Sequence, residues 1–361
     1  MKAVVLYEVK KAPVVEDLTP PAPGPEEALV RLAACGVCHS DYSMYDGTIP
    51  GNLPLVLGHE GAGVVEAVGR DVTTAKPGDH VVLSWTPDCG RCFYCRIGQP
   101  TQCELGPSLV RPLKRYKKGE TAISQMAGIG TMSELTVVHQ MSLIPIDPDL
   151  PLDKAALIGC AVMTGVGAVI NTAKVEPGSS VAVFGCGGVG LNVIQGARLA
   201  GAERIIAIDR LPGKLAQAKR FGATHTLNAD DGDIVEAVRA LTEGRGADYT
   251  FEVIGIPEVM AKAYYAARPA GTVVIIGGAA PGTRLSISAG MVPRFEKKLL
   301  GSYYGSARPR YDMPRLLGLY RSGRLMLDEL ITRTYPIEEA WSAFQALEAG
   351  ENIRGLIRFA A

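Results

Sequence analysis

The sequence lacks three features that would each point to a class of function. No uninterrupted apolar run approaches the length needed to span a bilayer, which argues against a membrane-spanning protein. Lys plus Arg and Asp plus Glu are both 37, and the net charge of zero provides no long-range field that would favour nucleic acid or anionic lipid. There is also no internal repeat, low-complexity tract or run of like charges. A small-molecule partner is therefore expected.

Nothing at the N-terminus resembles a secretion signal, although the chain contains eight cysteines. These two observations predict a cytoplasmic protein, because cysteines in a reducing compartment persist as thiolates that bind metals rather than as disulfides. The 361 residues exceed the size at which one hydrophobic core keeps growing, so two domains are expected.

Four of the cysteines form a C-x2-C-x2-C-x7-C run: Cys89, Cys92, Cys95 and Cys103. Four thiolates complete the tetrahedral coordination of Zn²⁺, so the run predicts a structural zinc site that has no open position for chemistry. Disulfides are the alternative, but cysteines two residues apart seldom meet disulfide geometry without strain. The spacing therefore favours zinc.

The character of the sequence changes twice along the chain. Up to about residue 150 it is broken by Pro and Gly and contains short strand-like runs, which predicts a β-rich domain with long connections. From Gly178 apolar β-branched runs alternate with helical segments, as in βαβ units on a parallel sheet. After about residue 300 the pattern is mixed again and ends in a predicted strand at 355–359, so this last part is expected to rejoin the first domain.

A glycine-rich motif at 185–190 predicts a dinucleotide site. It follows an apolar strand and opens a helix, so its glycines would let the backbone approach a pyrophosphate at the helix N-terminus. Asp209, at the end of the next strand, would bind the adenosine ribose and repel a 2′-phosphate, which selects NAD over NADP. Arg210 could support that phosphate, so weak use of NADP is allowed. The predicted cofactor contacts here are Gly185, Gly187, Gly188, Val189, Gly190, Asp209 and Arg210.

Two further cysteines and a histidine have the residue types of an open metal site. Cys38, His59 and Cys160 match the two-Cys, one-His set of catalytic zinc, which leaves a fourth position for water or substrate. The three are far apart in sequence, so the fold must bring them together. A buried cysteine that acts as a small hydrophobe is the alternative interpretation, and Cys35 and Cys186 are assigned to that class.

These residues lie in segments that carry a family resemblance along the whole chain. The chain resembles the zinc-dependent medium-chain alcohol dehydrogenases. The most specific segments are 58–65 (GHEGAGVV), 76–79 (KPGD), the four-cysteine run, 158–160 (IGC) with Thr164-Gly165, and 185–190.

The resemblance implies an α/β protein of two domains. A GroES-like, β-rich catalytic domain at 1–160 and 304–361 would contain both zinc sites. A Rossmann domain with a doubly wound parallel sheet, at 161–303, would bind NAD, and the active site would lie in the cleft between the two. The implied activity is hydride transfer between an alcohol and NAD, with two zinc ions per subunit.

It also implies roles for single residues. Cys38, His59 and Cys160 would hold the catalytic zinc. Ser40 would hydrogen-bond the substrate oxygen and Asp41 would orient His59, while Arg354 would contact the pyrophosphate. The remaining residues assigned to the catalytic group are Glu60 and Trp85, and the remaining cofactor contacts are His39, Thr164 and Lys214.

Two positions depart from the family pattern. His39 stands where an arginine often contacts the pyrophosphate, and it is a weaker anion partner unless protonated. Ser43 stands where many members have the histidine that ends the proton relay from the alcohol to solvent. Water near Ser43 is expected to take over that step.

Substrate and assembly are less constrained by the sequence. Trp85 with Tyr303 or Tyr304 suggests an aromatic lining suited to medium-chain, allylic or benzylic alcohols, and Cys160 argues against the polyol branch, which usually has Glu there. A glutathione-adduct (formaldehyde) dehydrogenase and a non-catalytic nucleotide-binding protein of the same fold are the alternatives. A homodimer is expected from the long segment 103–160 and from the last strand of the Rossmann sheet, with a tetramer as the other possibility.

Overall fold

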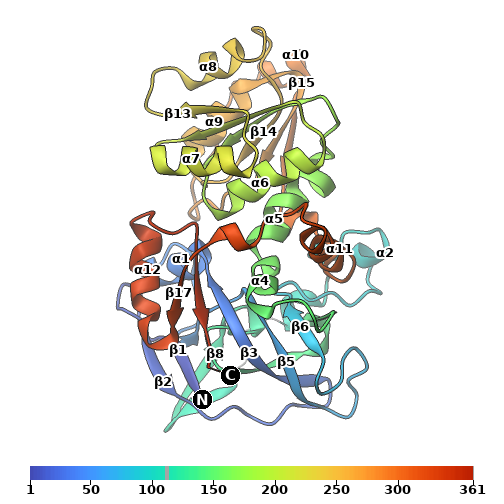
Figure 1. The fold of residues 1–361 in the computed structure, drawn as a ribbon, viewed down its shortest axis with the longest axis vertical. Coiled ribbons are helices and arrows are strands. Elements are labelled where there is room, and N and C mark those ends of the chain that lie inside the picture. Colours follow the sequence, from blue (N-terminus) through green and yellow to red (C-terminus); the bar gives the residue numbers. More distant parts are fainter. Residues whose placement is uncertain (110–113, 361) are drawn as a thin grey trace. The chain divides into compact units, whose positions relative to one another are not determined.

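The structure is a computed structural model that describes residues 1–109 and 114–360. It divides into two compact units, one made of Met1–Cys160 with Arg308–Ala361 and the other of Ala161–Ala307. We call them unit 1 and unit 2. Both chain termini belong to unit 1, whereas unit 2 is one continuous segment (Figure 1).

The return to unit 1 comes at Arg308, later than the predicted boundary at 304. Residues 304–307 stay with unit 2 because they pack on its first helices. Asn171 Nδ2 donates a hydrogen bond to the carbonyl oxygen of Gly305 over 3.2 Å, and Thr172 Oγ1 lies 2.8 Å from Ser306 Oγ. A Cβ atom on Gly305 would collide with the Met163 carbonyl, so the two segments are in backbone contact.

Unit 1 is built on two sheets, and several of their strands, such as β1, β6 and β18, are buried over most of their length. A five-stranded sheet has the order β2-β1-β4-β8-β7, and a seven-stranded sheet has the order β10-β6-β5-β3-β18-β17, with β9 also paired to β3. In chain order these strands are β1 Lys2–Leu6, β2 Val14–Asp17, β3 Glu27–Val37, β4 Leu55–Val56, β5 Gly61–Val68, β6 His80–Leu83, β7 Tyr116–Lys118, β8 Thr121–Gln125, β9 Leu135–His139, β10 Leu143–Ile146, β17 Ile331–Pro336 and β18 Arg354–Arg358.

The long strand β3 organises this unit. It pairs antiparallel with β5, β9 and β18, so the C-terminal strand is hydrogen-bonded into the N-terminal part of the chain, as expected. Its inward side chains, among them Val30 and Leu32, join a core that also contains Leu57, Leu83 and Phe344. The helices of this unit are α1 His39–Asp46, α2 Phe93–Arg96, α3 Gly106–Leu109, α4 Leu152–Ala155, α11 Pro309–Arg321 and α12 Ala340–Glu348, with the short 3-10 helix η4 Ala156–Gly159.

Unit 2 has one six-stranded sheet in which all pairings are parallel, in the order β13-β12-β11-β14-β15-β16. The strands are β11 Ser180–Phe184, β12 Arg204–Asp209, β13 His225–Asn228, β14 Ala247–Glu252, β15 Ala267–Ile275 and β16 Lys298–Gly301. Chain order reverses between β11 and β14, and ligands of such sheets bind at the carboxyl ends of the strands beside this point.

The helices of unit 2 cover both faces of that sheet. Helices α6 and α7 lie on one face and α9 on the other (Figure 1). The β-branched strands β11 and β12 are buried between them, which explains their continuous apolar runs. The helices are α5 Ala161–Gly167, α6 Gly188–Leu199, α7 Pro212–Phe221, α8 Ile234–Ala240, α9 Pro257–Ala266 and α10 Met291–Phe295, and the π-helix η5 Ala168–Ala173 follows α5.

Within the described residues, no single helix has both the length and the apolar character of a membrane span. One bent pair, Leu152–Gly159 with Ala161–Ala173, meets the criterion by length and composition only.

Candidate functional site

Unit 1 brings together the three residues predicted to form an open metal site. Cys38 caps the N-terminus of α1, His59 lies between β4 and β5, and Cys160 directly follows η4. All three are buried, and their ligand atoms lie within 4.8 Å of one another. The fold therefore joins residues that are separated by more than a hundred positions in the sequence.

Asp41 connects two of these residues. Its Oδ2 accepts a hydrogen bond from the Cys38 backbone N–H over 3.0 Å. Its Oδ1 accepts one from the Gly58 backbone N–H over 3.0 Å and lies 3.2 Å from His59 Nδ1. Gly58 has φ +95°, and a Cβ atom there would lie 2.8 Å from the Met132 side chain, so glycine is required at this turn.

The histidine is oriented for metal binding. Its Nδ1 faces Asp41, while its Nε2 is buried and has no hydrogen-bond partner in the part of the chain that the structure describes. A buried polar atom without a partner is unfavourable unless a ligand satisfies it. Together with two thiols, this nitrogen forms a donor set of the kind that catalytic zinc prefers, so the residues fit a zinc ion.

The three ligand side chains shift one another's pKa values. The neighbouring Cys160 lowers the pKa of the Cys38 thiol well below its usual range, although burial opposes this, and Arg354 adds to the shift. Conversely, Cys38 and burial raise the pKa of Cys160. Burial lowers the pKa of His59, but Asp41 and Cys38 outweigh it and raise that pKa well above the ordinary value. The metal-free cluster therefore holds protons that a metal must displace.

A buried ion pair lies beside the cluster. Arg354 Nε is 4.0 Å from Glu60 Oε2, and both side chains are almost fully buried. Glu60 lies over Gly36, where any Cβ atom would collide with its carboxylate, and Arg354 Nη1 donates to the Val37 carbonyl oxygen over 3.4 Å. Arg354 is thus enclosed in unit 1 next to the cluster, and its predicted contact with a pyrophosphate stays a prediction.

The other predicted residues of the catalytic group lie around the same three ligands. Ser40 Oγ is 3.9 Å from Cys38 Sγ. The Trp85 ring meets the His59 ring edge-on, with ring centroids 6.2 Å apart. His39, in contrast, is exposed at the start of α1. Of the two tyrosines suggested as pocket lining, Tyr304 is buried in unit 2 and Tyr303 is exposed.

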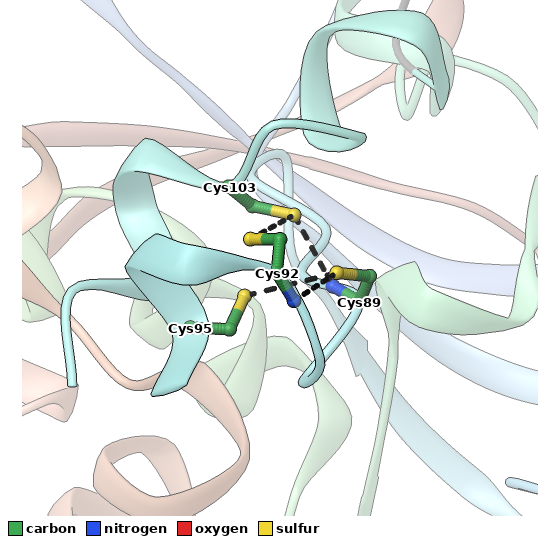
Figure 2. A group of neighbouring side chains, drawn as sticks. All are labelled: Cys89, Cys92, Cys95 and Cys103. Carbon is green, nitrogen blue, oxygen red and sulfur yellow. Dashed lines mark hydrogen bonds between the residues drawn. The ribbon is translucent and has the colours of Figure 1, made fainter. Parts of the chain in front are cut away.

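The four-cysteine run forms a second cluster, in unit 1 (Figure 2). Cys89 Sγ is 4.0 Å from Cys95 Sγ, and Cys92 Sγ is 3.9 Å from Cys103 Sγ. Tetrahedral zinc with bonds of 2.3 Å requires sulfurs about 3.8 Å apart, so the spacing fits. Backbone N–H groups of Cys95 and Glu104 lower the pKa of the Cys92 thiol to about 6, which favours the thiolate that a metal needs.

In unit 2 the glycine-rich motif lies at the predicted strand-to-helix turn. Gly185 has φ +102°, and Gly187 caps the N-terminus of α6. A Cβ atom on Gly190 would collide with the Gly185 carbonyl, which explains why the helix starts so close to the strand. Gly188 and Val189 of the motif lie in the first turn of α6.

The acidic residue after β12 holds this turn. Asp209 Oδ2 accepts a hydrogen bond from the Cys186 N–H over 2.8 Å, and Oδ1 accepts one from the Leu211 N–H over 3.0 Å. Burial raises the pKa of the Cys186 thiol to about 12; Asp209 adds to this rise and Lys214 opposes it, so both charged side chains lie near the motif. Thr164 lies on α5, which packs against α6 through Gly165.

Two acidic residues of unit 2 were missed by the sequence analysis. Asp230 binds Arg210, whose Nε lies 3.0 and 3.1 Å from its two carboxylate oxygens. Glu252 is fully buried at the carboxyl end of β14. An acid that ends an apolar strand was the available signal for Glu252, whereas nothing in the sequence relates Asp230 to Arg210.

The fold and these clusters are those of a zinc-binding dehydrogenase with a Rossmann-type unit, and comparison with known proteins agrees. Residues 24–148 match the model of the alcohol dehydrogenase GroES-like domain, and residues 188–322 match that of the zinc-binding dehydrogenases. Together the two matches cover most of the chain.

Whole-length relatives are similar as well. The chain is 39% identical to the NDMA-dependent alcohol dehydrogenase of Amycolatopsis methanolica, over 100% of this chain and 99% of that one. It is 41% identical to the S-(hydroxymethyl)glutathione dehydrogenase of Saccharomyces cerevisiae, over 99% and 95%. The crystal structure of benzyl alcohol dehydrogenase from Acinetobacter calcoaceticus superimposes with a TM-score of 0.93 at 31% identity, over 99% of both chains. The chain therefore belongs to the zinc-type medium-chain alcohol dehydrogenase family.

Proposed function

We propose that the protein is an NAD-dependent alcohol dehydrogenase whose catalytic zinc is held by Cys38, His59 and Cys160. The observation that carries this proposal is the buried cluster of three ligand atoms within 4.8 Å, in which His59 Nε2 has no hydrogen-bond partner among the described residues. Three protein ligands leave a fourth position of a tetrahedral ion for the substrate oxygen.

A zinc ion in this site would act as a Lewis acid that polarises the substrate oxygen, while NAD would accept the hydride. The side chains of this protein prepare that step. Asp41 contacts the His59 ring at Nδ1, which would leave Nε2 free to bind a metal. Ser40, close to Cys38, would accept the proton that leaves the alcohol.

We assign the four-cysteine cluster to a second, structural zinc, giving two zinc ions per subunit. Four sulfurs occupy all tetrahedral positions, so this ion would stabilise the segment 89–103 and take no part in the reaction.

NAD is favoured over NADP because Asp209 lies at the end of β12, where its carboxylate would bind the adenosine ribose and repel a 2′-phosphate. The backbone N–H groups of Cys186 and Leu211 donate to the Asp209 carboxylate and hold it in place. The contacts proposed for Arg354, His39, Lys214 and Thr164 with the cofactor rest on the family resemblance.

The substrate class follows from Trp85, whose ring stands next to His59. We propose medium-chain or benzylic alcohols. Two of the relatives suggest other reactants: one is named as an NDMA-dependent alcohol dehydrogenase and one as an S-(hydroxymethyl)glutathione dehydrogenase.

The deciding experiment measures zinc content and the rates of NAD reduction with ethanol, hexanol, benzyl alcohol, sorbitol and S-(hydroxymethyl)glutathione, and repeats the alcohols with NDMA in place of free NAD. We expect hexanol and benzyl alcohol to give the highest kcat/KM with NAD. A preference for the glutathione adduct would identify the alternative activity. Binding of NADH without turnover of any substrate would instead favour the non-catalytic function.

We further propose a cytoplasmic homodimer. Strand β16 pairs only with β15 within the described part of the sheet, and Leu299 on it is exposed. Such an edge can pair with a second copy across a two-fold axis. Analytical ultracentrifugation that gives a clean tetramer or a monomer would contradict this assembly.

A further inference from the structure

Glu252 is a buried acid with no assigned role, placed where unit 2 is predicted to bind its dinucleotide. It is the last residue of β14 and pairs in register with Phe184, the residue before the glycine-rich motif. Both residues stand at the carboxyl edge of the sheet, on the two strands between which the chain order reverses. The exposed fraction of Glu252 is 0%.

One oxygen of this carboxyl group holds the loop 253–256. Glu252 Oε1 accepts hydrogen bonds from the backbone N–H groups of Ile254, over 2.9 Å, and Gly255, over 2.7 Å. The other oxygen, Oε2, is buried and has no hydrogen-bond partner within the described residues. Burial raises the pKa of Glu252, and the N–H groups of the loop oppose that rise.

The loop in turn forms one wall of the glycine-rich turn. A Cβ atom on Gly185 would lie 2.7 Å from Ile254 Cγ1 and 2.9 Å from Val253 Cγ2, so these two side chains press directly on the first motif glycine. The Val253 N–H also donates to the Phe184 carbonyl. On its other side the loop touches a second turn, because a Cβ atom on Gly277 would collide with the Gly255 backbone.

From this geometry we infer that Glu252 is a positioning residue for the dinucleotide: through Oε1 it fastens the loop 253–256 against the glycine-rich turn and so sets the affinity for NAD(H). The inference rests on the proposed use of NAD. Because one oxygen, Oε1, accepts both bonds, we expect binding to depend more on the position of this oxygen than on the charge of the side chain.

Two conservative variants separate the effect of the side chain's length at position 252 from the effect of its charge. Glu252→Gln keeps the acceptor oxygen at the same distance and removes the charge. Glu252→Asp keeps the charge but withdraws the oxygen by one methylene. If the released loop is correctly placed only about a tenth of the time, the apparent Kd rises about tenfold.

The experiment measures the Kd of NADH by fluorescence titration of the zinc-loaded protein, together with hydrogen–deuterium exchange of peptides that contain residues 253–256. We expect Glu252→Gln to bind NADH within about threefold of the parent and Glu252→Asp about tenfold more weakly, with faster exchange in the loop.

Asp248→Asn is the matched control. Asp248 stands near the opposite end of the same strand, where its Oδ2 accepts hydrogen bonds from the Ser180 N–H and hydroxyl group. This substitution should lower the melting temperature without changing the Kd of NADH. If it weakens NADH binding as much as Glu252→Asp does, a general loss of stability in unit 2 explains both results.

The outcomes are distinct. Weak binding by Glu252→Gln with tight binding by Glu252→Asp would overturn the inference, because charge rather than reach would then matter. So would unchanged loop exchange in Glu252→Asp. A parent protein that binds no NADH would overturn the proposed function instead, while the exchange data would still test whether Glu252 fastens the loop.

Discussion

Asp41 Oδ1 lies 3.2 Å from His59 Nδ1, at the point where the helix that carries Asp41 meets the turn that carries His59. Such a contact fixes which imidazole nitrogen faces a metal, and losing it typically weakens metal binding by about 10- to 100-fold. We expect Asp41→Asn to lower the affinity of the catalytic site by about that factor. Titration with a zinc chelator, monitored by activity and by zinc analysis, tests this.

The same contact makes zinc binding depend on pH. Because Asp41 and Cys38 raise the pKa of His59 against the effect of burial, the metal-free ring keeps its proton to higher pH than an ordinary histidine. Zinc must displace that proton, so its affinity for this site should fall as the pH falls. Equal zinc affinity at pH 6 and pH 8 would contradict the assignment of His59 as a ligand.

Cys160→Ala should abolish turnover and leave the second zinc and NADH binding intact. Only the open site loses a ligand, since Cys160 groups with Cys38 and His59 and not with the four-cysteine cluster. Zinc analysis should then give one ion per subunit. Substantial activity in a variant with full zinc content would show that Cys160 is not a ligand.

Cys95→Ala should act on stability rather than on chemistry. A closed four-thiolate site contributes to folding directly, so its loss should loosen the segment 89–103 and lower the melting temperature. Limited proteolysis with mass analysis should locate the first cleavage in that segment. A variant with the parent's melting temperature and zinc content would refute a structural metal there.

Cofactor preference should depend on two acids. Asp209→Ala removes the repulsion of a 2′-phosphate, but Arg210 remains paired with Asp230 in the structure. Adding Asp230→Asn should therefore raise the NADP/NAD ratio of kcat/KM further, by up to about fivefold, the range of an exposed ion pair.

The matched control for that prediction is Asp231→Asn. Asp231 is also exposed, and the substitution removes the same negative charge. In the structure Asp231 is held to this turn by its backbone N–H, which donates to the Asn228 carbonyl oxygen. If both asparagine variants raise NADP use equally, net charge and not the release of Arg210 is responsible.

Ser43→His should change the pH profile of alcohol oxidation. Ser43 lies on α1 one turn after Ser40, so an imidazole there is placed to take a proton onward from that hydroxyl. We expect single-turnover hydride transfer to rise up to about tenfold near pH 6.5 and little at pH 9. Identical profiles, without buffer dependence in the parent, would indicate another proton exit.

The sequence predicted the structure best where a short stretch of residues determines the local fold. The apolar strand before the glycine-rich motif, the turn that follows it and the grouping of the four cysteines were predicted as found, because each is encoded by residues close together in the sequence. The family and the α/β fold class are confirmed by the comparisons.

What the sequence could not predict depends on tertiary contacts. The strand β13 at His225–Asn228 was missed because all four of its residues are only half-buried and show no apolar pattern. The enclosure of Arg354 beside Glu60 was missed as well, since an arginine in a polar segment resembles an exposed cation until the fold surrounds it. The contact of Arg210 with Asp230 spans 20 positions and has no motif.

The division of the chain at Cys160 and Arg308 also has a consequence for engineering. Every cysteine and histidine of the two metal clusters precedes residue 161, while the glycine-rich motif, Asp209 and Glu252 all lie in the uninterrupted stretch 161–307. Unit 2, which we propose binds the coenzyme, is thus one continuous segment inserted into the chain of unit 1, which contains both metal clusters. A graft of 161–307 from a relative with another coenzyme preference, joined after Cys160 and before Arg308, would exchange the redox partner while leaving every metal ligand native.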